Sequence, residues 1–149
     1  MSHWLAIDHG TKRLGLAVGD TTSQVATPVK VLKATPADAA LEEILCLARQ
    51  YHSDGIVVGW PINMDDSEGP QAKAARSLAK ELADISELEV RLWDERLSSF
   101  QADSYMAGKL TRKKRRARQD AVAAAVILED FLTHDGPNSA PTPDGKPED

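Results

Sequence analysis

The chain has 149 residues, which is within the usual size of a single domain, and 42% of them are hydrophobic and 28% charged. This composition excludes a wholly disordered or fibrous protein, and no apolar run is long enough to cross a bilayer. The N-terminus shows no signal-type segment, and the single cysteine excludes an internal disulfide. We therefore expect a cytoplasmic protein without a membrane partner.

The formal net charge of -5 is unevenly distributed along the chain. The segment Lys109–Arg118 contains seven of the 18 Lys and Arg residues and no acid, so the remainder has 11 basic and 23 acidic residues, a formal charge of -12. A basic run of this kind attracts phosphate groups, although it is also typical of a solvated helix face. The charge distribution therefore permits a nucleic-acid partner but does not establish one.

The N-terminal part of the sequence predicts three strands. The apolar stretches Trp4–Asp8 and Leu14–Val18 flank a short turn, which is typical of a β-hairpin. The segment Val25–Leu32 is rich in β-branched residues and contains Pro28, which indicates an edge strand or a bulge.

Helices and strands then alternate. Thr35 as N-cap and Pro36 at the first helical position predict the start of a helix. The continuous apolar run Gly55–Gly59 is typical of a parallel strand covered on both faces, and a helix over Gln71–Ile85 and a strand over Leu88–Trp93 follow.

Two further helices complete the predicted order βββαβαβαα. Ser98 and Gln101 form a possible capping box, and the last helix runs from about Arg112 to Leu132. We expect an α/β domain over residues 1–134, with a mixed five-stranded sheet of three antiparallel N-terminal strands and two further parallel strands, flanked by helices. The proline-rich residues 135–149 contain too little apolar surface to offset the entropy of ordering, so we expect a disordered tail.

Two acidic residues follow predicted strands, at the rim where α/β sheets place their sites. Asp8 ends the first strand, and Gly10 behind it would let a ligand approach the backbone. Glu95 and Asp94 follow the last strand, where alternation sends their carboxylates to opposite sides. Asp8 could instead accept hydrogen bonds within the turn, and Glu95 could form a surface ion pair with Arg96.

A third acid, Asp120, shares a helical stripe with Ala124, Leu128 and Phe131 and so faces the core. A carboxylate in that position is costly unless a cation or hydrogen-bond donors compensate it, although an acid near a helix N-terminus is the simpler alternative. Three carboxylates without zinc-type ligands form an oxygen-only set, which suits Mg²⁺ or Mn²⁺. The reaction that such a set supports is phosphodiester hydrolysis.

Four segments resemble the signature blocks of the YqgF family, whose members are described as pre-16S rRNA nucleases or Holliday-junction-resolvase-like proteins. These are DHGTKRLGLAVGD, VVGWPINMDDSEGPQA, DERLSS and QDAVAAAVILEDFL, spanning roughly Leu5 to Leu132. The resemblance implies an RNase H-like fold, with Asp8, Glu95 and Asp120 as catalytic, metal-binding acids. The sequence departs from the family pattern at Trp60 and Asp66, where a smaller aliphatic residue and a glycine are expected.

The resemblance and the basic segment together indicate a set of nucleic-acid-binding candidates. These are Lys12, Arg13, Asn63, Arg96, Arg112, Lys113, Lys114, Arg115 and Arg116. Gly59 and Pro61 also fall on motif positions of the family.

The favoured interpretation is a metal-dependent nuclease acting on structured RNA, with 5′-end maturation of pre-16S rRNA implied by the resemblance. A resolvase-like endonuclease on branched DNA and a non-catalytic RNA-binding factor in ribosome assembly remain alternatives. DHGTKR also resembles the phosphate hairpin of actin-like ATPases, but those enzymes clamp their nucleotide between two domains and this chain predicts one. The sequence leaves open whether the protein is a monomer or a homodimer.

Overall fold

The fold was analysed in a computed structural model that describes residues 1–97 and 112–143, with side chains described for 1–96 and 121–143. Its elements are β1 (His3–His9), β2 (Arg13–Asp20), β3 (Ala26–Lys33), α1 (Ala37–Gln50), β4 (Gly55–Trp60), α2 (Pro70–Ile85), β5 (Glu89–Asp94), the short 3-10 helix η1 (Glu95–Leu97), α4 (Arg112–Thr133) and α5 (Gly136–Ser139).

The strands form one five-stranded sheet in the order β3-β2-β1-β4-β5. β1 pairs antiparallel with β2, and β2 with β3, whereas β4 pairs parallel with both β1 and β5. The predicted mixed sheet with three antiparallel N-terminal strands and two parallel strands is confirmed. β3 is an edge strand, and its register with β2 shifts opposite Leu16 and Ala17, next to Pro28. Pro28 therefore lies at an edge and beside a bulge, as predicted.

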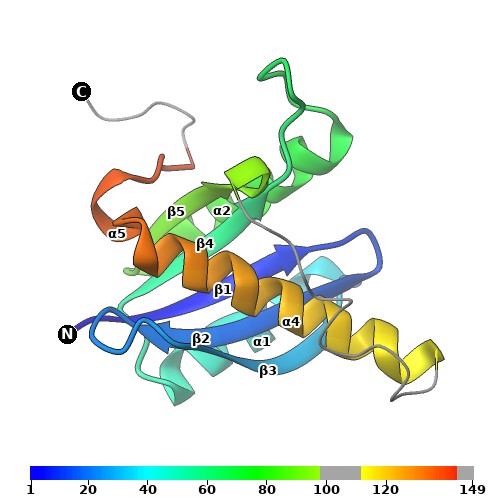
Figure 1. The fold of residues 1–149 in the computed structure, drawn as a ribbon. Coiled ribbons are helices and arrows are strands. Elements are labelled where there is room, and N and C mark those ends of the chain that lie inside the picture. Colours follow the sequence, from blue (N-terminus) through cyan, green and yellow to red (C-terminus); the bar gives the residue numbers. More distant parts are fainter. Residues whose placement is uncertain (98–111, 144–149) are drawn as a thin grey trace.

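Helices cover both faces of the sheet (Figure 1). One apolar cluster joins alternate strand residues such as Leu5 and Ile56 to α1 and α2. The other joins the intervening residues, including Ala6 and Val57, to the buried side of α4. Because side chains alternate along a strand, this division fixes which strand residues face α4.

The start of α1 differs from the sequence prediction. The N-cap is Pro36 rather than Thr35, and no side chain caps the helix. The predicted capping box of Ser98 and Gln101 lies outside the described residues. Within the described ranges, no helix is both long and apolar enough to span a bilayer.

The segment after α4 also differs from the sequence prediction, which expected disorder from residue 135 onward. Residues 136–139 form α5, and the backbone N–H of Leu92 in β5 donates to the carbonyl of Pro141 at 2.8 Å. The side chain of Arg91 donates to the carbonyl of Ala140 at 2.6 Å. The prediction therefore does not hold for residues 136–143, because hydrogen bonds to the edge of the sheet stabilise a segment that is poor in apolar side chains.

Candidate active site

Asp8 and Glu95 meet beside a glycine at the end of the parallel strands. The register pairs Ile7 of β1 with Val58 of β4, so the next residues, Asp8 and Gly59, lie side by side. Gly59 in turn pairs with Trp93 of β5, two residues before Glu95, where η1 begins. A Cβ atom on Gly59 would lie 3.0 Å from Glu95 Oε2. Gly59 therefore leaves the space that the carboxylate of Glu95 occupies.

Both carboxylates lie on the side of the sheet that α4 covers. Asp8 has the same alternation as Trp4 and Ala6, which pack in the cluster with α4. The Cβ position of Gly59 would also lie 2.7 Å from Ile127 Cδ1, which places α4 against the same point. Asp8 and Glu95 thus face a common space beneath α4.

The electrostatic environment of Glu95 is unfavourable to its negative charge. Burial, followed by repulsion from Asp8 and then from Asp94, raises its pKa to about 7. A pair of carboxylates that disfavour each other's charge becomes favourable when a cation binds between them. This arrangement fits the oxygen-only ligand set that Mg²⁺ or Mn²⁺ prefers.

Asp94, next to Glu95 in sequence, has a different partner. Its carboxylate accepts hydrogen bonds from Arg96 Nε at 3.0 and 3.1 Å and from Arg96 Nη2 at 2.7 Å. The two neighbouring acids therefore have different surroundings: Asp94 binds Arg96, whereas Glu95 lies against Gly59.

Arg96 connects the active-site rim to the loop between β4 and α2. Its Nη1 donates to the carbonyl of Asn63 at 2.9 Å, and its Nη2 lies 2.9 Å from Asp66 Oδ1. Hydrogen bonds to the carboxylates of Asp94 and Asp66 raise the pKa of the Arg96 guanidinium further above its already high value. Arg96 thus holds the loop, and direct contact of Arg96 or Asn63 with a nucleic acid stays a prediction.

The two departures from the family pattern are both accommodated in this loop. Asp66 has a φ of 69°, in the left-handed region where glycine is favoured and aspartate is tolerated, and it pairs with Arg96. Trp60 Nε1 donates to Glu68 Oε2 at 2.8 Å, and Glu68 Oε1 pairs with Arg76 at 2.7 Å. The larger residues therefore have defined partners within the loop and α2.

Asp120 and the candidates Arg112, Lys113, Lys114, Arg115 and Arg116 all lie in α4, but their side chains are outside the described set. Asp120 is one turn before Ala124 and two turns before Ile127, both of which are buried. Among the described side chains, no group of three potential metal ligands is present. The described residues thus bring together Asp8 and Glu95, and the third predicted acid stays a prediction.

The β1–β2 turn carries Lys12 and Arg13. Lys12 is exposed, and Arg13 begins β2, with its carbonyl accepting from Gly10 N at 2.9 Å. A Cβ atom on Gly10 would lie 2.6 Å from that carbonyl oxygen, so a side chain is excluded there. The glycine is required by the turn itself.

A sequence profile of the RuvX family, described as Holliday junction resolvase, matches residues 2–134. The chain belongs to the RuvX family. Proteins named "Putative pre-16S rRNA nuclease" are similar along most of their length. The one from Roseiflexus sp. (strain RS-1) is 39% identical over 86% of this chain and 92% of its own, and the one from Anaeromyxobacter sp. (strain Fw109-5) is 41% identical over 87% and 95%. The resemblance identified in the sequence is confirmed.

The RuvX chain also resembles a solved structure of T. thermophilus RuvC in complex with Holliday junction substrate. The TM-score is 0.59 at 15% sequence identity, over 95% of this chain and 99% of that one. At this identity the likeness concerns the fold, and the predicted RNase H-like fold is confirmed.

Sequence reasoning missed one connection in this RuvX protein, that between α2 and the β1–β2 turn. Gln71, in the first turn of α2, donates from Nε2 to the carbonyl of His9 at 2.8 Å, and its Oε1 accepts from Thr11 at 3.4 Å. Gln71 lies within one of the signature blocks, so its place in the motif was the available signal.

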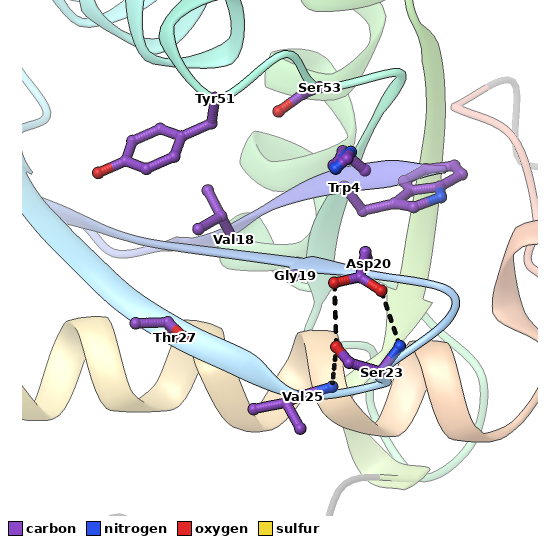
Figure 2. Close-up of a pocket in the computed structure, with 10 residues that line it drawn as sticks. Trp4, Val18, Gly19, Asp20, Ser23, Val25, Thr27, Tyr51 and Ser53 are labelled. Carbon is purple, nitrogen blue, oxygen red and sulfur yellow. Dashed lines mark hydrogen bonds between the residues drawn. The ribbon is translucent and has the colours of Figure 1, made fainter. Parts of the chain in front are cut away.

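The protein also has a pocket remote from Asp8 and Glu95. A hollow of about 330 Å³ lies at the other end of β1, and its lining includes His3, Asp20, Tyr51 and Ser53 (Figure 2). The Asp20 carboxylate is engaged there by Ser23, and hydrogen bonds from that residue lower its pKa. This pocket is separate from the candidate active site.

Proposed function

We propose that this RuvX protein is a divalent-metal-dependent nuclease that hydrolyses phosphodiester bonds in structured RNA. Relatives such as those from Roseiflexus sp. and Anaeromyxobacter sp. bear the name "Putative pre-16S rRNA nuclease", so 5′-end maturation of pre-16S rRNA, in the cytoplasm, is the proposed role. The observation that carries the proposal is the facing pair Asp8 and Glu95, whose mutual repulsion contributes to the raised pKa of Glu95, at about 7.

The proposed metal ligands are Asp8 and Glu95, with Asp120 of α4 as the third. Support for Asp120 comes from helix geometry, because it shares a face with Ala124 and Ile127, and Ile127 lies at Gly59. A bound Mg²⁺ or Mn²⁺ would polarise the phosphoryl oxygen and lower the pKa of an attacking water. The role of the chain is to hold carboxylate oxygens at fixed positions, which the register of β1, β4 and β5 achieves.

The substrate backbone is proposed to follow the basic residues. Lys12 and Arg13 lie on the turn directly after Asp8, and Arg112, Lys113, Lys114, Arg115 and Arg116 begin α4, which carries Asp120. Phosphate contacts of this type give an affinity that falls steeply with salt. Binding should therefore weaken as ionic strength rises.

A second candidate is cleavage of branched DNA. The RuvX profile is described as Holliday junction resolvase, and the fold is that of RuvC. The metal chemistry attacks the same bond in either polymer, so the protein surface outside the carboxylates decides the substrate.

Parallel cleavage assays test both candidates. The wild type, Asp8→Asn, Glu95→Gln and Asp120→Asn are compared on a precursor 16S rRNA fragment and on a four-way DNA junction, with Mg²⁺, Mn²⁺ or EDTA. We expect metal-dependent RNA cleavage by the wild type, a loss of at least about 100-fold in each variant, and retained RNA affinity. Cleavage confined to the junction would favour the second candidate. Retained RNA binding without any cleavage would favour a non-catalytic assembly factor.

A further inference from the structure

The loop between β4 and α2 presents an exposed apolar side chain near the candidate active site. Met64 is 86% exposed, the highest value among the large hydrophobic residues that the structure describes. In Figure 1 this connection stands out from the body of the protein on the side where η1 lies.

Hydrogen bonds within the loop fix the position of Met64. Asn63 N donates to the carbonyl of Ser67 at 2.9 Å, and Asp66 N donates to the carbonyl of Asn63 at 2.9 Å, which closes a turn around Met64. Asn63 Nδ2 also donates to Ser67 Oγ at 3.0 Å. An exposed side chain on a closed turn of this kind has a preorganised backbone, which lowers the entropy cost of binding.

Hydrogen bonds join the loop to the residues that directly follow both acids. Arg96, which directly follows Glu95, donates to the carbonyls of Asn63 at 2.9 Å and Met64 at 3.4 Å. At the other end of the loop, Gln71 donates to the carbonyl of His9, which directly follows Asp8. Met64 is therefore held at a defined position relative to the candidate cleavage site.

The charges beside Met64 indicate which part of a nucleic acid it can contact. Asp65 and Asp66 follow it directly, and hydrogen bonds from Ser67 lower the pKa of Asp65, so that its carboxylate is charged at neutral pH. Carboxylates repel a phosphate backbone, whereas the faces of unstacked bases are neutral and apolar. An apolar tip bordered by acids is thus suited to a base rather than to a phosphate.

We propose that Met64 packs against an unstacked base beside the cleaved phosphodiester, so that the loop selects nucleic acids whose base stacking is already interrupted. This inference rests on the proposed nuclease function. Methionine is among the apolar side chains that proteins insert between base steps. An interrupted step costs less to open than a continuous helix, which gives the selectivity.

The test begins by mapping the cleavage site of the wild type. A 2-aminopurine base is then placed beside that site, and its fluorescence on binding is measured with Glu95→Gln and with the double variant Glu95→Gln, Met64→Ala. We expect the fluorescence change of the first protein to be largely lost in the second. Equal changes would overturn the proposal and leave Met64 as a contact for another macromolecule, such as a basic protein.

Cleavage kinetics give an independent readout. Met64→Ala should lower kcat/KM about tenfold on a substrate with an unpaired step and much less on a continuous duplex, while Met64→Leu retains activity. Ile85→Ala is the matched control, because Ile85 is also an exposed apolar residue, 55% exposed on α2. An equal loss on both substrates would contradict the selectivity. Failure of the nuclease function would appear separately, as an absence of metal-dependent cleavage by the wild type.

Discussion

Gly59 and Glu95 are so close that a Cβ atom on the glycine would stand 3.0 Å from Glu95 Oε2. The same atom would stand 2.7 Å from Ile127 Cδ1, so a side chain on Gly59 would press on both the carboxylate and α4. The glycine thereby links the packing of α4 on the sheet to the position of a proposed metal ligand.

We predict that Gly59→Ala lowers both stability and activity. Overpacking should reduce the free energy of unfolding by about 1 to 3 kcal/mol, and displacement of Glu95 should reduce cleavage about 100-fold. Urea unfolding and cleavage assays measure the two effects. Gly69→Ala is the control, because its Cβ would meet only Asn63 Nδ2 at an ordinary 3.8 Å. Similar losses in both variants would show that the effect is not specific to the Glu95 contact.

The raised pKa of Glu95 predicts that the metal-free protein becomes less stable as pH rises. Between the ordinary value of 4.5 and about 7, the folded protein retains a proton that the unfolded chain has released. The free energy of unfolding therefore falls across this interval, by about 3 kcal/mol at most. Glu95→Gln removes the charge, so in EDTA the variant should be more stable than the wild type near pH 8 and similar to it near pH 5.

Thermal unfolding of the wild type and Glu95→Gln at both pH values measures this difference. Glu81→Gln on α2 is the control, because it makes the same chemical change at an exposed carboxylate. Its effect on stability should therefore not follow the pH dependence expected for Glu95→Gln. A stability difference that does not change with pH would contradict the assignment of the effect to the charge on Glu95.

Metal binding should show the opposite pH dependence. Mn²⁺ competes with the proton for Glu95, so its affinity should fall as pH decreases below about 7. We expect Mn²⁺ to raise the Tm of the wild type near pH 8 and to have little effect near pH 5. Asp8→Asn should abolish the Mn²⁺-dependent increase at both pH values. A Tm increase that persists in this variant would place the ion elsewhere.

The sequence predicted the sheet well because hydrophobic alternation and glycine or proline boundaries are local signals. It also predicted that Asp8 and Glu95 lie at the same rim of the sheet, because parallel strands end at the same rim. The role of Arg96 as the link to the loop was not predictable, since Arg96 and Asn63 are 33 residues apart and no periodic pattern connects them. The sequence favoured substrate binding or a simple surface ion pair for this arginine. The structure gives its guanidinium four partner residues, the carboxylates of Asp94 and Asp66 and the carbonyls of Asn63 and Met64.

Loss of Arg96 should loosen the loop without unfolding the sheet. In Arg96→Ala the carboxylate of Asp94 and the carbonyl of Asn63 lose the hydrogen bonds that the guanidinium donates, so the loop should become more susceptible to proteolysis and amide exchange. Hydrogen exchange of residues 61–69 measures this. Arg91→Ala is a matched control, because Arg91 also binds a carboxylate and a carbonyl, those of Glu89 and Ala140, away from the loop. Increased exchange of the loop in both variants would argue against a specific clamp.

The contacts of residues 136–143 predict that this segment contributes to stability. Gly136 is buried, and a Cβ atom there would overlap the ring of Phe131, so Gly136→Ala should displace α5.

Truncation after residue 135 would remove the carbonyl that accepts from Leu92 N and expose the edge of β5. We expect truncation to lower the free energy of unfolding by about 1 to 3 kcal/mol, because a buried donor loses its partner. Truncation after residue 143 is the control and should have little effect. Equal stability of the two truncated proteins in urea unfolding would show that the contacts of α5 and Pro141 with the sheet contribute nothing.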